Sequence, residues 1–203
     1  MENYSNNSVI LNKSLIKKYP WLIPRSRRTG KVINNYDYTW TELDAMPKGW
    51  REAFGELLCE EIQEELEKFN FVEKYMIIQI KEKNAELRWY DNGYPSGSKL
   101  HDIISNYSAL SSYICIKCGE LDVPCVSNGW IVPMCKNCLK KTSIKNPENY
   151  WEQISKEQFP YTLPLTRTYK QWSFIKDEPE IITVDLAPTV QKIRKRYAER
   201  HGK

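Results

Sequence analysis

Four of the six cysteines stand in two CxxC pairs, Cys115/Cys118 and Cys135/Cys138. Their spacing is typical of a four-cysteine zinc site. Thiolates suit the tetrahedral coordination that zinc prefers, and four of them leave no position open for water. The pattern therefore predicts a zinc ribbon in which the zinc is structural and not catalytic. Two disulfides or free thiols are the alternative.

Neighbouring residues fit the same interpretation. Gly119 follows the first pair and can adopt the positive φ that a tight knuckle around a metal needs. Asn137 lies inside the second pair and also tolerates left-handed geometry. Between the pairs, Trp130-Ile131-Val132 is expected to form a strand that leads back to the metal.

The cysteine pattern also predicts a compartment. The first residues, MENYSNNSV, are polar and lack the basic and apolar regions of a signal peptide. CxxC pairs without a secretion signal favour metal binding in a reducing environment. We therefore expect a cytoplasmic protein. The sequence has no apolar run of about 18 residues, so we expect no membrane partner.

Charge alternates in sign along the chain, although the formal net charge is only +4. Residues 1–36 hold seven basic residues and one acidic residue, whereas residues 37–75 hold four basic and eleven acidic residues. Residues 188–203 are again basic, with six basic residues and one acidic residue. The chain is therefore not uniformly basic, and any charged partner must be sought segment by segment.

The elements that position the cysteines begin with a helix predicted over residues 47–70. Pro47 is favourable in a first helical turn. Apolar residues recur at helical spacing and form one stripe, Trp50, Phe54, Leu57, Leu58, Ile62, Leu66 and Phe69. Cys59, beside the stripe, is expected to be a small core residue. The opposite face carries four carboxylates, Glu56, Glu60, Glu64 and Glu67.

A β-hairpin is predicted next, with strands at 76–81 and 87–90. A second amphipathic helix over residues 99–113 runs directly into Cys115, so we expect the ribbon to be fused to this helix. The predicted fold class is α+β: a small antiparallel hairpin packed with two amphipathic helices, a fused four-cysteine zinc ribbon, and an extended or helical C-terminal segment.

Four regions follow from these elements. We expect a flexible N-terminal arm (1–18) whose end becomes helical from Val9, an α+β core (19–113), the zinc ribbon (114–140) and a C-terminal extension (141–203). Residues 19–24 are expected to be an extended segment packed on the core, because Pro20 and Pro24 interrupt a helix. The extension is expected to contain, in order, a basic link (140–145), a short helix (146–158), an extended aromatic segment (159–175), a strand (181–186) and a basic helix (188–200).

Several short motifs in the first two thirds of the chain form a recognisable order. They are YPWLIPR from Tyr19, WTELD from Trp40, Gly49-Trp50, QIKEK from Gln79, LRWY from Leu87, and the two CxxC pairs around Gly129-Trp130. This order resembles a family of largely uncharacterised bacterial proteins found in phages, prophages and mobile elements. The resemblance covers residues 19–140. At Asn84-Ala85 the chain departs from the family, whose members typically have an aromatic residue followed by Gly.

The resemblance implies a zinc-ribbon accessory protein of mobile elements in a bacterial host cell, and it implies no reaction. We expect a non-enzymatic protein that binds a host protein or nucleoprotein complex, in an oligomeric state that the sequence does not give. The carboxylates of the acidic helix could imitate phosphates in the basic groove of a nucleic-acid enzyme, or they could simply be solvated. Small phage proteins commonly act against host immunity, and this analogy makes a defence system such as CRISPR-Cas a candidate target.

Sequence-independent binding of DNA or RNA is the alternative function. Basic groups gain by displacing counterions from phosphates, and aromatic rings can stack on bases. The candidate cations lie near aromatic residues at the N-terminal side and in the C-terminal helix: Arg25, Arg27, Arg28, Lys31, Lys192, Arg194, Lys195 and Arg196. The competing interpretation is that the first group neutralises the acidic helix of the same molecule and that the C-terminal group is a solvated face.

A metal-dependent nuclease is the second alternative. It needs carboxylates that converge on one point with a lysine nearby. Glu82, Lys83, Glu86 and Asp91 supply these residue types around the predicted hairpin, but the sequence does not fix their geometry. The two histidines, His101 and His201, are expected to be surface or capping residues.

Overall fold

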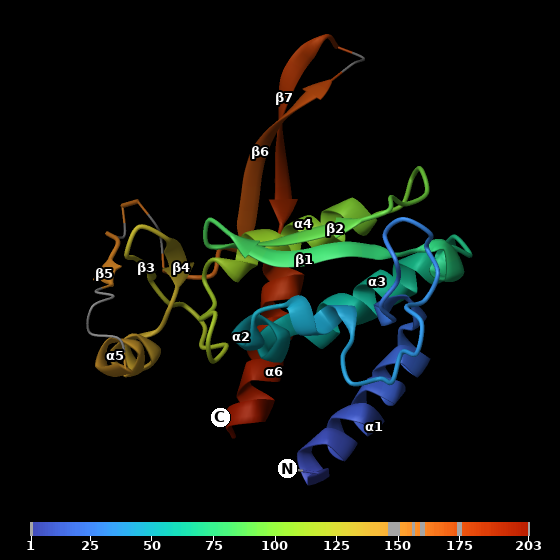
Figure 1. Ribbon diagram of the computed structural model, residues 1–203. Coiled ribbons are helices and arrows are strands. Elements are labelled where there is room, and N and C mark those ends of the chain that lie inside the picture. The colour runs from blue at the N-terminus through green and yellow to red at the C-terminus, as the bar shows by residue number, and fades with distance from the viewer. Residues whose placement is uncertain (1, 146–150, 156, 159–160, 174–175, 203) are drawn as a thin grey trace.

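The computed structural model describes residues 2–145, 151–155, 157–158, 161–173 and 176–202. The fold is α+β, as predicted: helices pack with small antiparallel sheets (Figure 1). Within the described residues, no helix combines the length and the apolar character needed to cross a bilayer.

A long helical segment forms the centre of the core. It begins as α2 (Lys48–Trp50), passes through one π-helical stretch, η3 (Arg51–Gly55), and continues as α3 (Glu56–Lys68). The predicted helix is therefore confirmed to within about two residues at either end. Its apolar stripe faces the core: Trp50, Phe54, Leu58, Ile62 and Leu66 are buried, Leu57 is half-buried, and Phe69 is exposed. Cys59 is fully buried, as expected of a small core residue.

The β-hairpin of the core packs against the second amphipathic helix. Strands β1 (Ile77–Lys83) and β2 (Glu86–Asp91) pair antiparallel, with Lys83 opposite Glu86, and β2 lies along α4 (Leu100–Ser111). Asn84 and Ala85 form the two-residue turn, with φ values of 54° and 67°. Positive φ at both positions matches the right-handed twist of a hairpin, so the chain keeps a tight turn at the point where it departs from the family pattern.

The N-terminal region differs from the expected flexible arm, because α1 spans Glu2–Lys18. Leu15 and Ile16 pack against the core, and the buried Asn12 donates its amide to the Tyr38 carbonyl (2.9 Å). Residues 19–24 pack on the core as expected, but they include a 3₁₀ turn, η1 (Pro20–Leu22), because Pro at the first position of a helical turn fits its fixed φ. Two further 3₁₀ turns, η2 (Glu42–Ala45) and η4 (Val72–Lys74), complete this half.

The ribbon sheet has the strand order β4-β3-β5. Strands β3 (Cys125–Ser127) and β4 (Ile131–Pro133) confirm the strand expected before the second cysteine pair, although it begins at Ile131 instead of Trp130. Helix α5 (Lys136–Lys145) replaces the basic link that was expected to start at Lys140, because the helix already begins inside the second CxxC pair. The expected ribbon boundary at residue 140 therefore falls inside a helix.

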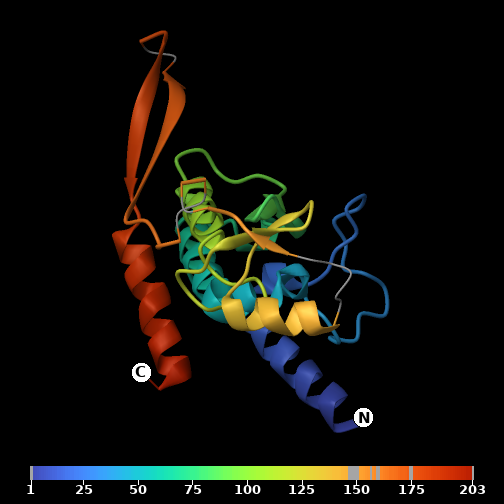
Figure 2. The same ribbon diagram turned by 90° about the vertical axis from the view of Figure 1, so that its left-hand side faces the viewer.

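The elements of the C-terminal region lie in three different parts of the molecule. The short helix expected over 146–158 is wrong where it is described, because β5 (Glu152–Gln153) pairs with β3; residues 146–150 and 156 lie outside the described part. Strands β6 (Thr166–Ser173) and β7 (Glu178–Asp185) form a long hairpin that stands away from the body (Figures 1 and 2). Helix α6 (Ala187–His201) confirms the basic helix, and Val190 and Ile193 place it in the main core.

Core and ribbon meet at a contact between two backbones. The N–H of Gly49 donates to the Ile116 carbonyl (2.9 Å), and the Trp50 indole N–H donates to the Ile114 carbonyl (2.9 Å). A Cβ added at Gly49 would lie 2.1 Å from the Cys115 carbonyl oxygen, and one added at Gly119 would lie 2.7 Å from the Gly49 carbonyl oxygen. Neither position has room for a side chain, so the core supports the first cysteine knuckle directly.

We expect Gly49→Ala to lower the free energy of unfolding by about 3 kcal/mol, because the added methyl group must push two backbones apart. Gly55→Ala is the matched control in the same helical segment, since a Cβ there meets its nearest atom at 3.4 Å. The control should be neutral or stabilising by up to about 1 kcal/mol, the helix propensity gained over Gly. Urea unfolding of both variants checks this, and equal stabilities would contradict the steric argument.

Candidate metal centre and charged surfaces

The four cysteines of the two CxxC pairs converge on one point. The sulfur atoms of Cys115, Cys118, Cys135 and Cys138 all lie within 4.8 Å of one another. Cys118 Sγ and Cys135 Sγ are 3.7 Å apart. Two thiolates on a zinc ion at about 2.3 Å would be separated by about 3.8 Å in a tetrahedron, whereas a disulfide bond is only about 2 Å long. None of the six cysteines forms a disulfide, so the geometry fits a bound metal ion and not the disulfide alternative.

Backbone amides stabilise the sulfurs. The N–H of Cys135 donates to Cys115 Sγ (3.4 Å), and the N–H of Cys138 donates to Cys135 Sγ (3.4 Å). Gly119 has φ 76°, as expected for the turn after the first pair. Asn137, which tolerates left-handed geometry, does not adopt it, because it lies in the first turn of α5.

The protonation of the thiols depends on burial and on these amides. Burial acts to raise the pKa of Cys115, but amide hydrogen bonds from Cys135, Cys118 and Lys117 outweigh it and hold the pKa below its ordinary value. Burial raises the pKa of Cys118, and it raises that of Cys138 to about 12. Four thiolates this close together would repel one another, so a cation at their centre is what allows all of them to deprotonate.

The other two cysteines do not belong to this site. Cys125 is buried in β3 and donates weakly to the Ser112 carbonyl (3.7 Å), and burial raises its pKa to about 11. Burial also raises the pKa of Cys59, which is fully buried on the core side of α3. Raised pKa values and lack of access make both thiols unreactive.

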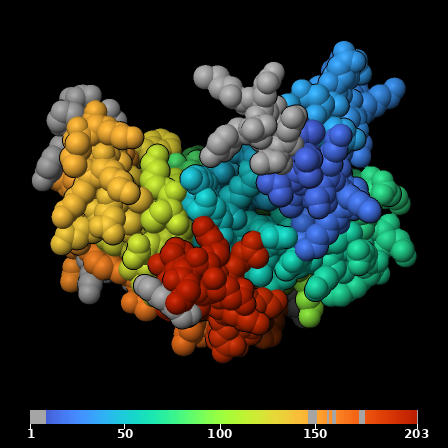
Figure 3. All heavy atoms as spheres, turned by 90° about the horizontal axis from the view of Figure 1, so that it is seen from below, coloured from blue at the N-terminus to red at the C-terminus, as the bar shows by residue number. Residues whose placement is uncertain are grey.

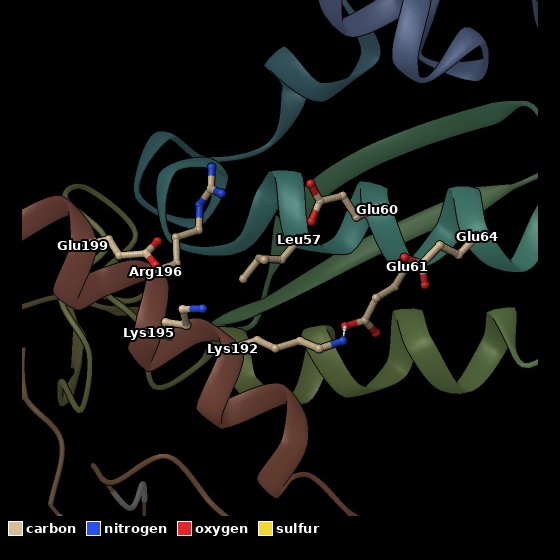
Figure 4. Close-up of a pocket in the computed structure, with 8 residues that line it drawn as sticks. All are labelled: Leu57, Glu60, Glu61, Glu64, Lys192, Lys195, Arg196 and Glu199. Atoms are coloured by element: carbon tan, nitrogen blue, oxygen red, sulfur yellow. Dashed lines mark hydrogen bonds and ion pairs between the residues drawn. The ribbon is translucent and has the colours of Figure 1, made fainter.

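Helix α6 neutralises much of the acidic helix. Three ion pairs run between the two helices: Lys192 with Glu61 (2.7 Å), Arg196 with Glu56 (2.8 Å), and Arg200 with Glu52 (2.8 Å). Seen from below, α6 and α1 flank the segment that begins at Lys48 (Figure 3). In close-up, Lys192 and Arg196 reach from α6 toward α3 across a hollow of about 360 Å³ (Figure 4).

The four carboxylates predicted to bind a protein therefore fall into two groups. Glu56 and Glu60 are ion-paired, Glu60 with Lys18 of α1 (2.9 Å), whereas Glu64 and Glu67 are exposed. A phosphate mimic needs free carboxylates, so Glu56 and Glu60 would first have to release their partners.

The cations predicted to bind nucleic acid are similarly divided. Besides Lys192 and Arg196, Arg194 is paired, with Asp122 of the ribbon (3.0 Å), and Lys195 lies at the rim of the hollow between α3 and α6. At the N-terminal side, Arg25 donates to the Gly30 carbonyl (3.1 Å) and is half-buried. Three cations of that group, Arg27, Arg28 and Lys31, are exposed. Helix α6, together with Lys18 of α1, is thus the element that neutralises the acidic helix.

The residues named for a nuclease site do not converge. Glu82 and Glu86 lie beside the hairpin turn, whereas Asp91 pairs with Ile77 at the opposite end of the strands. Glu82 accepts hydrogen bonds from the Ala85 N–H (2.8 Å) and the Trp130 indole (2.7 Å). In the described part of the chain, the four cysteines are the one group of three or more His, Cys, Asp or Glu residues close enough to hold a metal ion.

Two features escaped the sequence interpretation. The lysines of α5 gather on one exposed face of a helix, where a basic link was expected, and the β6–β7 hairpin projects into solvent. Lysine spacing over residues 136–145 was the available signal for the first. No comparable signal predicted the β6–β7 hairpin, because the alternation of exposed and half-buried residues can be recognised only after both strands have been located.

Comparisons with known proteins do not extend this description. A scan against protein-family models, a search of curated proteins and a search of solved structures found no match to this chain.

We expect the purified protein to contain one metal ion per chain and to lose it in Cys135→Ser. Structural zinc sites contribute roughly 10–16 kcal/mol of apparent binding free energy to folding, so this variant or a strong chelator should unfold the ribbon. Cys125→Ser is the matched control, because it removes a buried thiol from β3 of the ribbon and none of the four clustered cysteines. Elemental analysis and circular dichroism test this, and equal metal loss in both variants would contradict the assignment.

We expect the pair between Arg196 and Glu56 to make stability depend on pH. The hydrogen bond from Arg196 lowers the pKa of Glu56 from its ordinary 4.5, so the pair stabilises the fold above that pH and its contribution is lost as pH falls through the folded-state value. Arg196→Gln should cost about 0.5 kcal/mol at pH 7, as for other half-exposed pairs, and nothing in acid. Lys195→Gln on the same helix is the control, and an equal or pH-independent loss there would argue against the pair.

Proposed function

We propose that this chain is a zinc-stabilised binding protein, not an enzyme, and that it contacts a partner protein through the β6–β7 hairpin. The closed set of four cysteines supports a structural metal, and zinc is the ion that such a set prefers. The observation that carries the proposal is the projection of the hairpin from the body (Figures 1 and 2). Large apolar residues of this hairpin are exposed.

The outer face of the hairpin is apolar near its tip. Trp172 pairs with Pro179 and Lys170 with Ile181, so Trp172 and Ile181 lie on the same face. Their side chains are 48% and 68% exposed, and Leu165 at the base is 58% exposed. Exposed apolar groups gathered in this way mark interaction surfaces, and Trp is enriched among the residues that dominate binding energy.

Support for the hairpin is found at its base, where Arg167 donates to the Ser105 carbonyl of α4 (3.1 Å) and Val184 packs against the core. In the described part of the chain, β6 and β7 pair only with each other. An isolated two-stranded hairpin is marginally stable in water, so burial against another protein would remove a liability. The hairpin carries charges of both signs, with Arg167 and Lys170 on β6 and Glu178 and Glu180 on β7, which fits a protein surface better than a phosphate backbone.

The resemblance to phage and mobile-element proteins supports a setting in the bacterial cytoplasm. There the partner would be a host protein or nucleoprotein complex. Inhibition of a defence complex such as CRISPR-Cas is the role that we propose by analogy with other small phage proteins.

We expect tagged protein from a bacterial host to co-purify with a defined partner, and Trp172→Ser/Ile181→Ser to lower that recovery at least tenfold, since central aromatic and aliphatic anchors carry most interface energy. Thr168→Ala/Thr183→Ala, one cross-strand pair on the same face, is the matched control and should retain the partner. Metal content and thermal stability should be equal in all three proteins.

A second variant separates the hairpin from the acidic helix. Charge reversal at the exposed Glu64 and Glu67 should leave recovery of the partner unchanged. If the charge-reversal variant loses the partner and the hairpin variant keeps it, phosphate mimicry replaces the hairpin as the mode of binding.

A further inference from the structure

Helix α5 has one half made of lysines and one half packed on the ribbon. The packed half, which carries Cys138, Leu139, Thr142 and Ser143, is half-buried. The other half is exposed and holds Lys136, Lys140, Lys141 and Lys145, with Ile144, 81% exposed, between them. The helix contains no acidic residue. Figure 2 shows α5 on the outer side of the ribbon.

Lys117 of the first knuckle extends this face. It lines a groove of about 490 Å³ together with Lys141, Ile144 and Lys145. We call these five residues, Lys117, Lys136, Lys140, Lys141 and Lys145, the lysine face. Its members come from both cysteine knuckles, so the metal site fixes their arrangement.

The lysine face differs from the other basic elements in having no internal counterpart. None of its five ammonium groups forms an ion pair with any residue that the structure describes, whereas three of the four predicted tail cations do. Residues 114–145 contain two acidic residues, Glu120 and Asp122, and β5 adds Glu152; Asp122 already accepts from Arg194. Four thiolates around a divalent ion add a charge of about −2, which is smaller than the charge of five lysines.

We propose that the lysine face binds the phosphate backbone of double-stranded DNA without sequence preference. Ten helical residues span about 15 Å, and an exposed helix fits the B-form major groove, whereas the major groove of an RNA duplex is too narrow to admit one. The face of α5 carries no aromatic ring on which single-stranded bases could stack. Lysines act as point charges and do not provide the planar, bidentate base contacts of arginine.

This inference goes beyond the proposed function and does not depend on it. The two surfaces lie on different elements, the ribbon helix and the projecting hairpin. A chain with both could contact the nucleic acid and the protein of one nucleoprotein complex, but each contact can be tested while the other is intact.

We expect the metal-loaded protein to bind a DNA duplex of about 20 base pairs, two helical turns, in a fluorescence anisotropy titration. Four to five phosphate contacts predict that affinity falls about 150- to 500-fold between roughly 50 and 200 mM salt. Lys140→Gln/Lys141→Gln/Lys145→Gln should weaken binding at least tenfold at low salt and reduce the slope of log affinity against log salt by nearly three. Metal content and thermal stability measured on the same samples show that the fold is intact.

The matched control is Arg27→Gln/Arg28→Gln/Lys31→Gln, which removes the same charge from an exposed loop of the core and should retain at least half of the affinity. Equal loss in both variants would overturn the proposal, because binding would then follow net charge and not the lysine face. Absence of binding to the duplex at low salt would overturn it too. Tighter binding to single-stranded DNA or RNA than to the duplex would refute the choice of partner.

Discussion

The close contact between Gly49 and the first cysteine knuckle is the constraint on which the architecture depends. At this point the long central helix begins and the metal ligands begin, and no side chain separates them. Trp50 anchors the same junction through its hydrogen bond to the Ile114 carbonyl. A second tie, from the Trp130 indole to Glu82, joins the ribbon hairpin to the turn of the core hairpin. The four-cysteine cluster is thus joined directly to the core.

The distribution of charge follows from this architecture. The acidic helix lies between α6 and α1, both of which bring cations to it, so much of the formal charge at the two ends of the chain is neutralised inside the molecule. The lysines of α5 take no part in these ion pairs, because α5 lies on the far side of the contact between Gly49 and the first cysteine knuckle. Unpaired charges of one sign on one face repel one another, and this repulsion costs stability. The lysine face is therefore the strongest candidate surface for binding an anionic partner.

The sequence predicted the parts of the structure that depend on local pattern. Two CxxC pairs within 24 residues indicate a cluster that could hold a metal ion, and helical spacing places Trp50, Phe54, Leu58 and Ile62 on one buried face. Some errors were local, such as the helix of residues 2–18 and the start of α5 at Lys136. The features that the sequence could not indicate are contacts between distant segments. Charge signs were visible in the sequence, but the partnership of Arg196 with Glu56 links residues 140 positions apart. No propensity indicates that Gly49 must lack a side chain, since the atoms it would strike come from residues 115 and 119.

The order of synthesis gives the contact between α3 and α6 a further consequence. Glu52, Glu56 and Glu61 emerge from the ribosome long before the cations that face them, which belong to α6. Until then the nascent chain carries a strongly anionic helix beside a core that still lacks Val190 and Ile193. Contacts over so great a sequence separation form late and slowly. The acidic helix therefore loses its unpaired charge only after residues 187–201 have been synthesised, and a chaperone that meets the chain earlier would encounter a more acidic surface.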